Sequence, residues 1–118
     1  GESPEQACVR EVCEESGLLV INPRYHGVLK FWFGDKGDPN WVVHVFSTCS
    51  FQGELKESTE GILRWIEFDK IPYGEMWEDD KHWLPLLLKG NRFQGNFYFA
   101  EEGRELLDFS LKTWKAKC

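Results

Sequence analysis

The chain has 118 residues, of which 42% are hydrophobic, enough to bury one core but too few for two ordinary domains. Residues 1–118 are therefore expected to form a single domain. A net charge of -6 and a pI near 5.1 argue against a nucleic-acid polymer as the main partner. No apolar run approaches the roughly 20 residues of a membrane-spanning helix, so no membrane partner is expected.

The first predicted element is a helix that begins at Pro4 and ends before Gly17. Ser3 is a favourable N-cap, Gln6 completes a capping box with it, and proline suits the first helical position. Gly17 supplies the left-handed C-terminal cap. The apolar residues of the helix form one stripe that is expected to be buried: Ala7, Cys8, Val9 and Val12.

Three glutamates lie on the other side of the same helix. Glu11, Glu14 and Glu15 stand at positions i, i+3 and i+4, where like charges destabilise an isolated helix by about 0.2–0.5 kcal/mol per pair. A divalent cation would offset this repulsion, and carboxylates without a paired Cys or His nearby suit Mg2+ or Mn2+ better than zinc. The alternative is a solvated acidic face without a ligand, as most such clusters are.

The remaining elements are predicted from the alternation of apolar and polar residues and from the turn residues between them. They are, in order, a strand over 25–33, a turn over 34–40, a strand over 41–52, a strand over 62–67, a helix over 80–89, and strands over 93–100 and 105–114. The first two strands are expected to pair as one hairpin and the last two as another. A domain with these helices and hairpins belongs to the α+β class.

Two tryptophans and two adjacent acids stand at the start of the second helix. Trp77, Asp79, Asp80 and Trp83 would grip a flat heterocycle by stacking and by hydrogen bonds to its edge. The alternative is that both tryptophans fill the core and an aspartate caps the helix. In the first case, two close carboxylates in a low-dielectric site resist double ionisation, so one would donate a hydrogen bond while the other accepts.

The residues around the three glutamates match a family motif. Glu2, followed by Arg10-Glu11-Val12-x-Glu14-Glu15-x-Gly17-Leu18, resembles the Nudix box, G-x5-E-x7-REU-x-EE-x-GU with U aliphatic, at every fixed position from Glu2 onward. The first glycine of the motif would stand six positions before Glu2. The resemblance implies the Nudix fold, a mixed sheet sandwiched between helices, here lacking its N-terminal strands. It also implies that Glu2, Arg10 and Gly17 support the box, with Arg10 pairing with Glu2.

A longer stretch resembles the MutT-like oxidised purine nucleoside triphosphatases, the 8-oxo-dGTP diphosphatase branch of that family. The resemblance places a fourth metal ligand on Glu60 and base recognition on the segment from Trp77 to Trp83. It also places Phe31 and Trp41 in the base pocket, where Trp41 replaces a methionine of a family member. The implied reaction is Mg2+-dependent hydrolysis of a nucleoside triphosphate to the monophosphate and pyrophosphate, with Glu15 as the candidate general base.

The aspartate pair suggests how one pocket would read more than one oxidised purine. Such a purine differs from its parent mainly in its pattern of donors and acceptors. Moving one proton between Asp79 and Asp80 would therefore let the pocket accept both 8-oxoguanine and 2-hydroxyadenine.

Two other functions stay open on the sequence alone. One is a Nudix hydrolase of another nucleoside diphosphate derivative, such as ADP-ribose, and the other is a non-catalytic nucleotide-binding module. The expected partner is a small nucleoside triphosphate, while a monomer and association through exposed sheet edges both remain open. The cysteines show no C-x-x-C spacing and are interpreted as reduced thiols of a cytoplasmic protein: Cys8, Cys13, Cys49 and Cys118.

Overall fold

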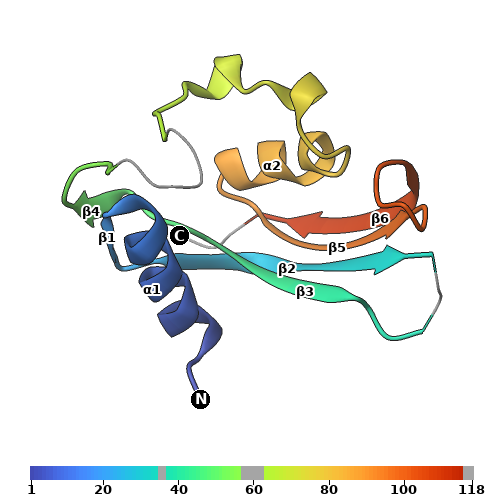
Figure 1. The fold of residues 1–118 in the computed structure, drawn as a ribbon, viewed down its shortest axis with the longest axis horizontal. Coiled ribbons are helices and arrows are strands. Elements are labelled where there is room, and N and C mark those ends of the chain that lie inside the picture. The colour runs from blue at the N-terminus through green and yellow to red at the C-terminus, as the bar shows by residue number, and fades with distance from the viewer. Residues whose placement is uncertain (35–36, 57–62, 116–118) are drawn as a thin grey trace.

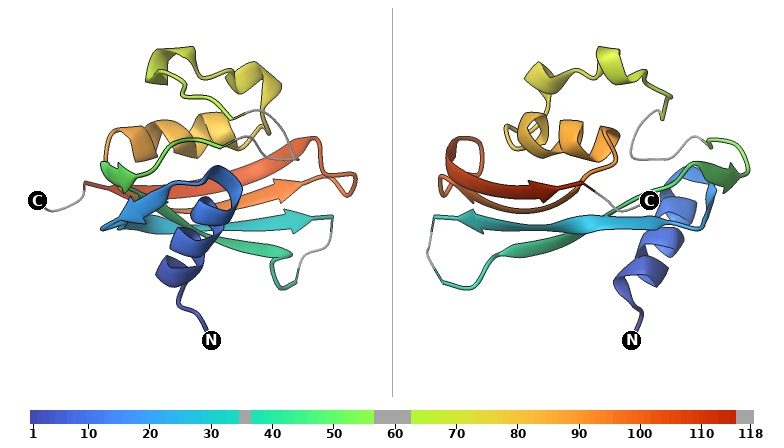
Figure 2. Two further views of the ribbon diagram at one scale, coloured as in Figure 1. Left: turned by 60° about the vertical axis from the view of Figure 1, so that its left-hand side comes forward. Right: turned by 180° about the vertical axis from the view of Figure 1, so that it is seen from behind.

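The computed structural model describes residues 1–34, 37–56 and 63–115. Within them the elements follow in the order α1 (Pro4–Ser16), β1 (Leu19–Ile21), β2 (Arg24–Phe33), β3 (Trp41–Ser47), β4 (Ser50–Gln52), η1 (Phe68–Lys70), η2 (Tyr73–Glu75), α2 (Asp80–Leu88), β5 (Arg92–Phe99) and β6 (Leu106–Trp114). Helix α2 covers one side of the main sheet, and α1 lies on the other side, next to β1 and β3 (Figure 1). Two further views show the same layering (Figure 2). The predicted α+β class, with a sheet between helices, is confirmed.

The main sheet has four strands in the order β3-β2-β5-β6. Strand β2 runs parallel to β5 and the other two pairs are antiparallel, so the sheet is mixed and both predicted hairpins are present. The parallel strands come very close at Gly27, where a Cβ would lie 1.7 Å from the carbonyl oxygen of Phe93. Only glycine fits where this pairing begins.

The core lies between the main sheet and α2. Its buried side chains alternate along the strands, as residues that share one strand face do. They are Leu29 and Phe31 of β2, Val45 of β3, and Phe93, Phe97 and Phe99 of β5. Trp83, Leu86 and Leu87 of α2 pack against them. Since burying one such side chain contributes about 1.5–3 kcal/mol, this layer holds α2 on the sheet.

Helix α1 has the predicted ends. The Ser3 hydroxyl accepts a hydrogen bond from the Gln6 backbone N–H at 3.1 Å, and the Gln6 side chain accepts one from the Ser3 N–H at 2.9 Å. Gly17 ends the helix in the left-handed conformation, with a φ of 82°. The apolar stripe is half-buried rather than buried, because the helix packs on the short β1 and the end of β3 rather than on a full sheet face.

Two predicted strands differ from the structure. The strand expected over 41–52 is divided, because the Thr48 hydroxyl donates to the Ile21 carbonyl at 2.6 Å and also accepts from the Ser50 N–H, which turns the chain. The second part, β4, pairs with β1 and not with β2. The strand expected over 62–67 is wrong for residues 63–67, which form no strand; there the ring of Trp65 lies against Phe51 instead.

Strand β3 is an outer strand of the main sheet and carries no charged residue. Trp41, Val42 and Val43 at its start are 57%, 50% and 40% exposed. An apolar outer strand of this kind is a site for pairing with another strand. Across the described part of the chain, no helix has the length and apolar character needed to cross a membrane.

Candidate active site

The acidic residues of α1 are exposed and held by one arginine. The Arg10 guanidinium forms two hydrogen bonds with the Glu2 carboxylate, at 2.7 and 2.8 Å, and contacts the Glu14 carboxylate at 3.2 Å. It also lies 3.6 Å from Glu11. These contacts lower the pKa of Glu2, chiefly through the hydrogen bond from Arg10. Arg10 therefore ties the start of the chain to the middle of the helix, while Glu15 stays on the exposed surface.

The acids of α1 fit a hard divalent cation by donor type, since all are carboxylate oxygens on one solvent-facing helix surface. Over residues 1–34, 37–56 and 63–115, no three acidic, His or Cys side chains converge into a metal-binding cluster. Glu60, the predicted fourth ligand, lies outside the described residues. The chain that leads toward it leaves from the C-terminal end of α1, because the Lys56 N–H donates to the Ser16 carbonyl at 2.9 Å.

The residues predicted to bind the base form part of a continuous aromatic surface. Phe33 connects them, with its ring centroid 5.1 Å from Trp41 and 6.3 Å from Trp77. Phe31 lies 6.3 Å from Trp41, and Phe99 lies 5.5 Å from Trp77. Trp41 and Trp77 are 57% and 51% exposed, whereas Phe31 and Phe99 are buried. The result is a layer of phenylalanine rings in contact with two half-exposed tryptophans, a suitable place for a flat ring.

Two members of this surface, Phe33 and Phe99, were not predicted from the sequence. Phe33 stands two residues after Phe31 and so shares its strand face, and this spacing could have predicted it from the sequence. Phe99 has no such signal, because it reaches Phe33 only through the parallel pairing of β2 with β5.

The aspartate pair is asymmetric. Asp79 is 4% exposed, and its carboxylate accepts a hydrogen bond from the Trp83 indole N–H at 2.9 Å. Asp79 stands at the N-cap position of α2, but its side chain makes no capping hydrogen bond. Trp83 packs against the core beside Phe93 rather than standing free for stacking. Burial, followed by the charge of Asp79, raises the pKa of Asp80 to about 6. Asp80 therefore keeps its proton to a higher pH than an ordinary aspartate does.

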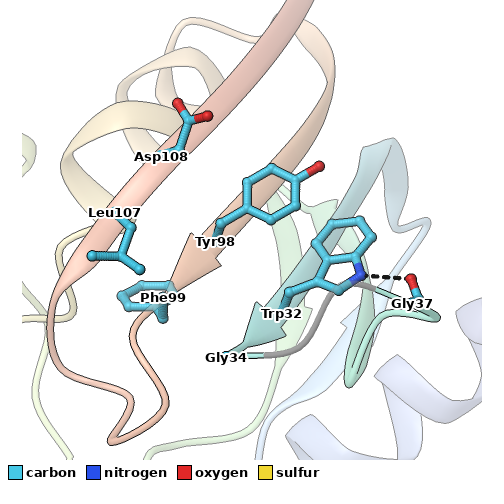
Figure 3. A pocket seen from close by; sticks show the side chains of 7 residues that line it. All are labelled: Trp32, Gly34, Gly37, Tyr98, Phe99, Leu107 and Asp108. Carbon is cyan, nitrogen blue, oxygen red and sulfur yellow. Dashed lines mark hydrogen bonds between the residues drawn. The ribbon is translucent and has the colours of Figure 1, made fainter.

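A hollow of about 530 Å³ is lined by none of the predicted site residues, although Phe99 of the aromatic surface borders it. Its side chains include Trp32 and Tyr98, which stack at 4.7 Å, with the Trp32 indole donating to the Gly37 carbonyl (Figure 3). Trp32 alternates with Phe31 and Phe33 along β2 and so points to the opposite face of the sheet. A second hollow, of about 440 Å³, is lined by Trp77 together with Glu78 and Arg104. The second hollow contains Trp77, a predicted base-binding residue, whereas the first contains no predicted site residue.

The family model described as "NUDIX domain" matches residues 1–87. The chain belongs to the Nudix family. This Nudix domain is 42% identical over 108 residues to the oxidized purine nucleoside triphosphate hydrolase of Danio rerio, covering 91% of the chain and 67% of that protein. It is 38% identical over 113 residues to the protein of the same name from Mus musculus, covering 95% and 70%.

Two bacterial proteins are also similar to this Nudix domain. An uncharacterized Nudix hydrolase of Bacillus subtilis is 35% identical over 115 residues, covering 94% of the chain and 72% of that protein. The crystal structure of a MutT protein from Bacillus halodurans matches with a TM-score of 0.84 and 31% identity, covering 95% of the chain and 75% of that structure. The predicted family and the Nudix fold are thereby confirmed.

Proposed function

We propose that this Nudix domain hydrolyses oxidised purine nucleoside triphosphates to the monophosphate and pyrophosphate and so removes them from the nucleotide pool. The observation that carries the proposal is the half-exposed Trp77, two residues before the buried Asp79, whose carboxylate accepts a hydrogen bond from the Trp83 indole N–H; an aromatic face and a fixed acceptor suit a purine ring with an altered edge. Two relatives named as hydrolases of such substrates support it.

The acidic face of α1 would supply the phosphate chemistry. Glu11, Glu14 and Glu15, with Glu60 as a fourth ligand, would hold Mg2+ or Mn2+. When bound, such a cation neutralises charge on the phosphate oxygens and lowers the pKa of a coordinated water. Glu15 is our candidate for the base that accepts a proton from the attacking water. Arg10 keeps the acidic face in place through Glu14 and through the loop residue Glu2.

The aromatic surface would hold the base. Trp77 and Trp41 are both half-exposed, and each contacts the ring of Phe33. Asp79 is kept as a hydrogen-bond acceptor by the Trp83 N–H, while Asp80 donates when protonated and accepts when ionised. This division of roles would let one pocket take both 8-oxoguanine and 2-hydroxyadenine.

Chromatography of the products formed with Mg2+ tests the proposal on 8-oxo-dGTP, 2-hydroxy-dATP, dGTP and ADP-ribose. A triphosphate would give its monophosphate and pyrophosphate, whereas ADP-ribose would give AMP and ribose 5-phosphate. We expect the two oxidised nucleotides to have a higher kcat/KM than dGTP, and Glu15→Gln to lower kcat for both about 10²–10⁴-fold. Turnover of ADP-ribose alone would favour the second hydrolase function. Binding without turnover of any compound would favour the non-catalytic module.

We propose two further properties of the protein. The described cysteines, Cys8, Cys13 and Cys49, are free thiols, which supports a reducing, cytoplasmic location. The apolar outer strand β3 supports association through a sheet edge over a monomer. Light scattering after size exclusion decides the second point, and a single monomer peak at high concentration would contradict it.

A further inference from the structure

The turn between β5 and β6 packs against two rings of the aromatic surface. Gly103 in this turn is buried, and a Cβ on it would lie 3.7 Å from ring atoms of both Phe33 and Trp77. Its φ of 85° lies in the left-handed region that favours glycine. The Gly103 N–H donates to the Ala100 carbonyl at 2.8 Å, and the Ala100 N–H donates to the Glu105 carbonyl at 2.8 Å. The turn therefore holds its backbone beside Trp77.

The residue after Gly103 is an exposed arginine, Arg104. Arg104 and Trp77 line the same hollow of about 440 Å³, a size that suits a small ligand. Among the residues that the structure describes, the ion pairs are formed by Arg10 and Lys70 and none by Arg104. A guanidinium has five N–H donors and no acceptor. Arg104 can therefore donate to an acceptor oxygen of a ligand in this hollow.

The other charges of the hollow argue against a phosphate as that ligand. Glu75 and Glu78 also line it, and both are exposed. Their carboxylates repel a phosphate, which carries the same sign of charge. A neutral carbonyl oxygen meets no such repulsion and still accepts from a guanidinium. The hollow therefore favours the edge of a base over the phosphate chain.

We propose that Arg104 is a specificity-determining residue: it donates a hydrogen bond to the carbonyl oxygen that oxidation adds to a purine, as in 8-oxoguanine. Arg104 and Asp79 then read different groups, because a carboxylate accepts from the N–H groups of a base and a guanidinium donates to its carbonyl groups. The proposal rests on the proposed function, because it places the oxidised base beside Trp77.

Arg104→Ala tests the proposal through kcat/KM for 8-oxo-dGTP and for dGTP, which lacks the added oxygen. We expect kcat/KM to fall about 10–100-fold for 8-oxo-dGTP, as the loss of a hydrogen bond to a charged group does, and to change less for dGTP. Arg24→Ala is the matched control, because Arg24 is also exposed but begins β2, at the opposite end of that strand from Phe33. Both values should stay close to the parent chain in this control.

Two further measurements separate the base from the phosphates and cover a variant that does not fold. Arg104→Lys keeps the positive charge but loses the planar fork of donors, so it should also reduce the preference for 8-oxo-dGTP over dGTP. NMR titration with 8-oxodeoxyguanosine, which has no phosphate, should show weaker binding to Arg104→Ala than to the parent chain.

Three results would count against the role of Arg104. An unchanged preference for 8-oxo-dGTP in folded Arg104→Ala and Arg104→Lys would overturn the proposal while leaving the proposed function intact. An equal loss for 8-oxo-dGTP and dGTP, with unchanged binding of the nucleoside, would overturn it as well and would assign Arg104 to the phosphates. An absence of turnover of oxidised nucleotides by the parent chain would overturn both the proposal and the proposed function.

Discussion

The acidic face of α1 and the aromatic surface below α2 are built in opposite ways. The acids come from one helix, are exposed, and are joined to their surroundings by ion pairs of Arg10. The aromatic rings come from three strands and the segment before α2, and they rest on a buried phenylalanine layer. Exposed ion pairs contribute little to stability, whereas buried aromatic contacts contribute much. Substitutions in the first region should therefore change turnover, and substitutions in the second should change substrate affinity or stability.

The largest effect is expected from Glu15→Gln. Replacing the candidate base, and one of the cation ligands, should lower kcat about 10²–10⁴-fold. The melting temperature should stay unchanged, because Glu15 is exposed. Steady-state kinetics on 8-oxo-dGTP and a thermal melt measure the two quantities. Glu5→Gln, in the first turn of the same helix and also exposed, is the control. An equal loss in Glu5→Gln would mean that only the total charge of the helix matters.

Trp77→Ala tests the aromatic surface and should weaken substrate binding. Stacking of a base on an aromatic ring contributes about 1–3 kcal/mol, so KM should rise about 5–150-fold while kcat changes less. Trp65→Ala is the matched control, because Trp65 is exposed to a similar degree but packs on Phe51 away from the aromatic surface. If both variants raised KM equally, the aromatic surface around Phe33 would not be the base site.

The acidic face lies on one helix, whereas the aromatic surface is assembled from several strands, and this difference explains what the sequence could predict. The ends of α1 and its acidic face follow from local spacing: capping residues three apart and acids at i, i+3 and i+4. Phe99 could not be assigned, because it meets Phe33 only through the pairing of β2 with β5, which no local pattern encodes. The strand over 62–67 failed for a related reason. Its apolar residues suit a strand, but a strand also needs a neighbour, and Trp65 packs on Phe51 instead.

Trp83→Phe separates packing from hydrogen bonding within the aromatic region. The ring stays large enough to contact Phe93, but the N–H that reaches Asp79 is lost. A buried carboxylate left without this donor should cost about 1–3 kcal/mol in the free energy of unfolding, measured by urea denaturation. Relative turnover of 8-oxo-dGTP and 2-hydroxy-dATP should change as well. Unchanged stability would show that Asp79 accepts a hydrogen bond from another donor in the variant. The difference between Asp79 and Asp80 would then not depend on Trp83.

The smallest effect is expected from the protonation of Asp80. Its pKa rises from 3.8 to about 6 in the folded state, so the folded protein holds this proton more tightly than the unfolded chain. Stability should therefore fall as pH rises from about 4 to about 6 and then level off, and Asp80→Asn should remove that part of the pH dependence. The ratio of turnover between 8-oxo-dGTP and 2-hydroxy-dATP should shift over the same pH range in the parent chain but not in Asp80→Asn. Glu78→Gln, one position before the pair, is the control. If the turnover ratio shifted with pH in Asp80→Asn as much as in the parent chain, another group would be responsible for the titration. The aromatic surface would then differ from the acidic face of α1 in its packing and not in a titrating group.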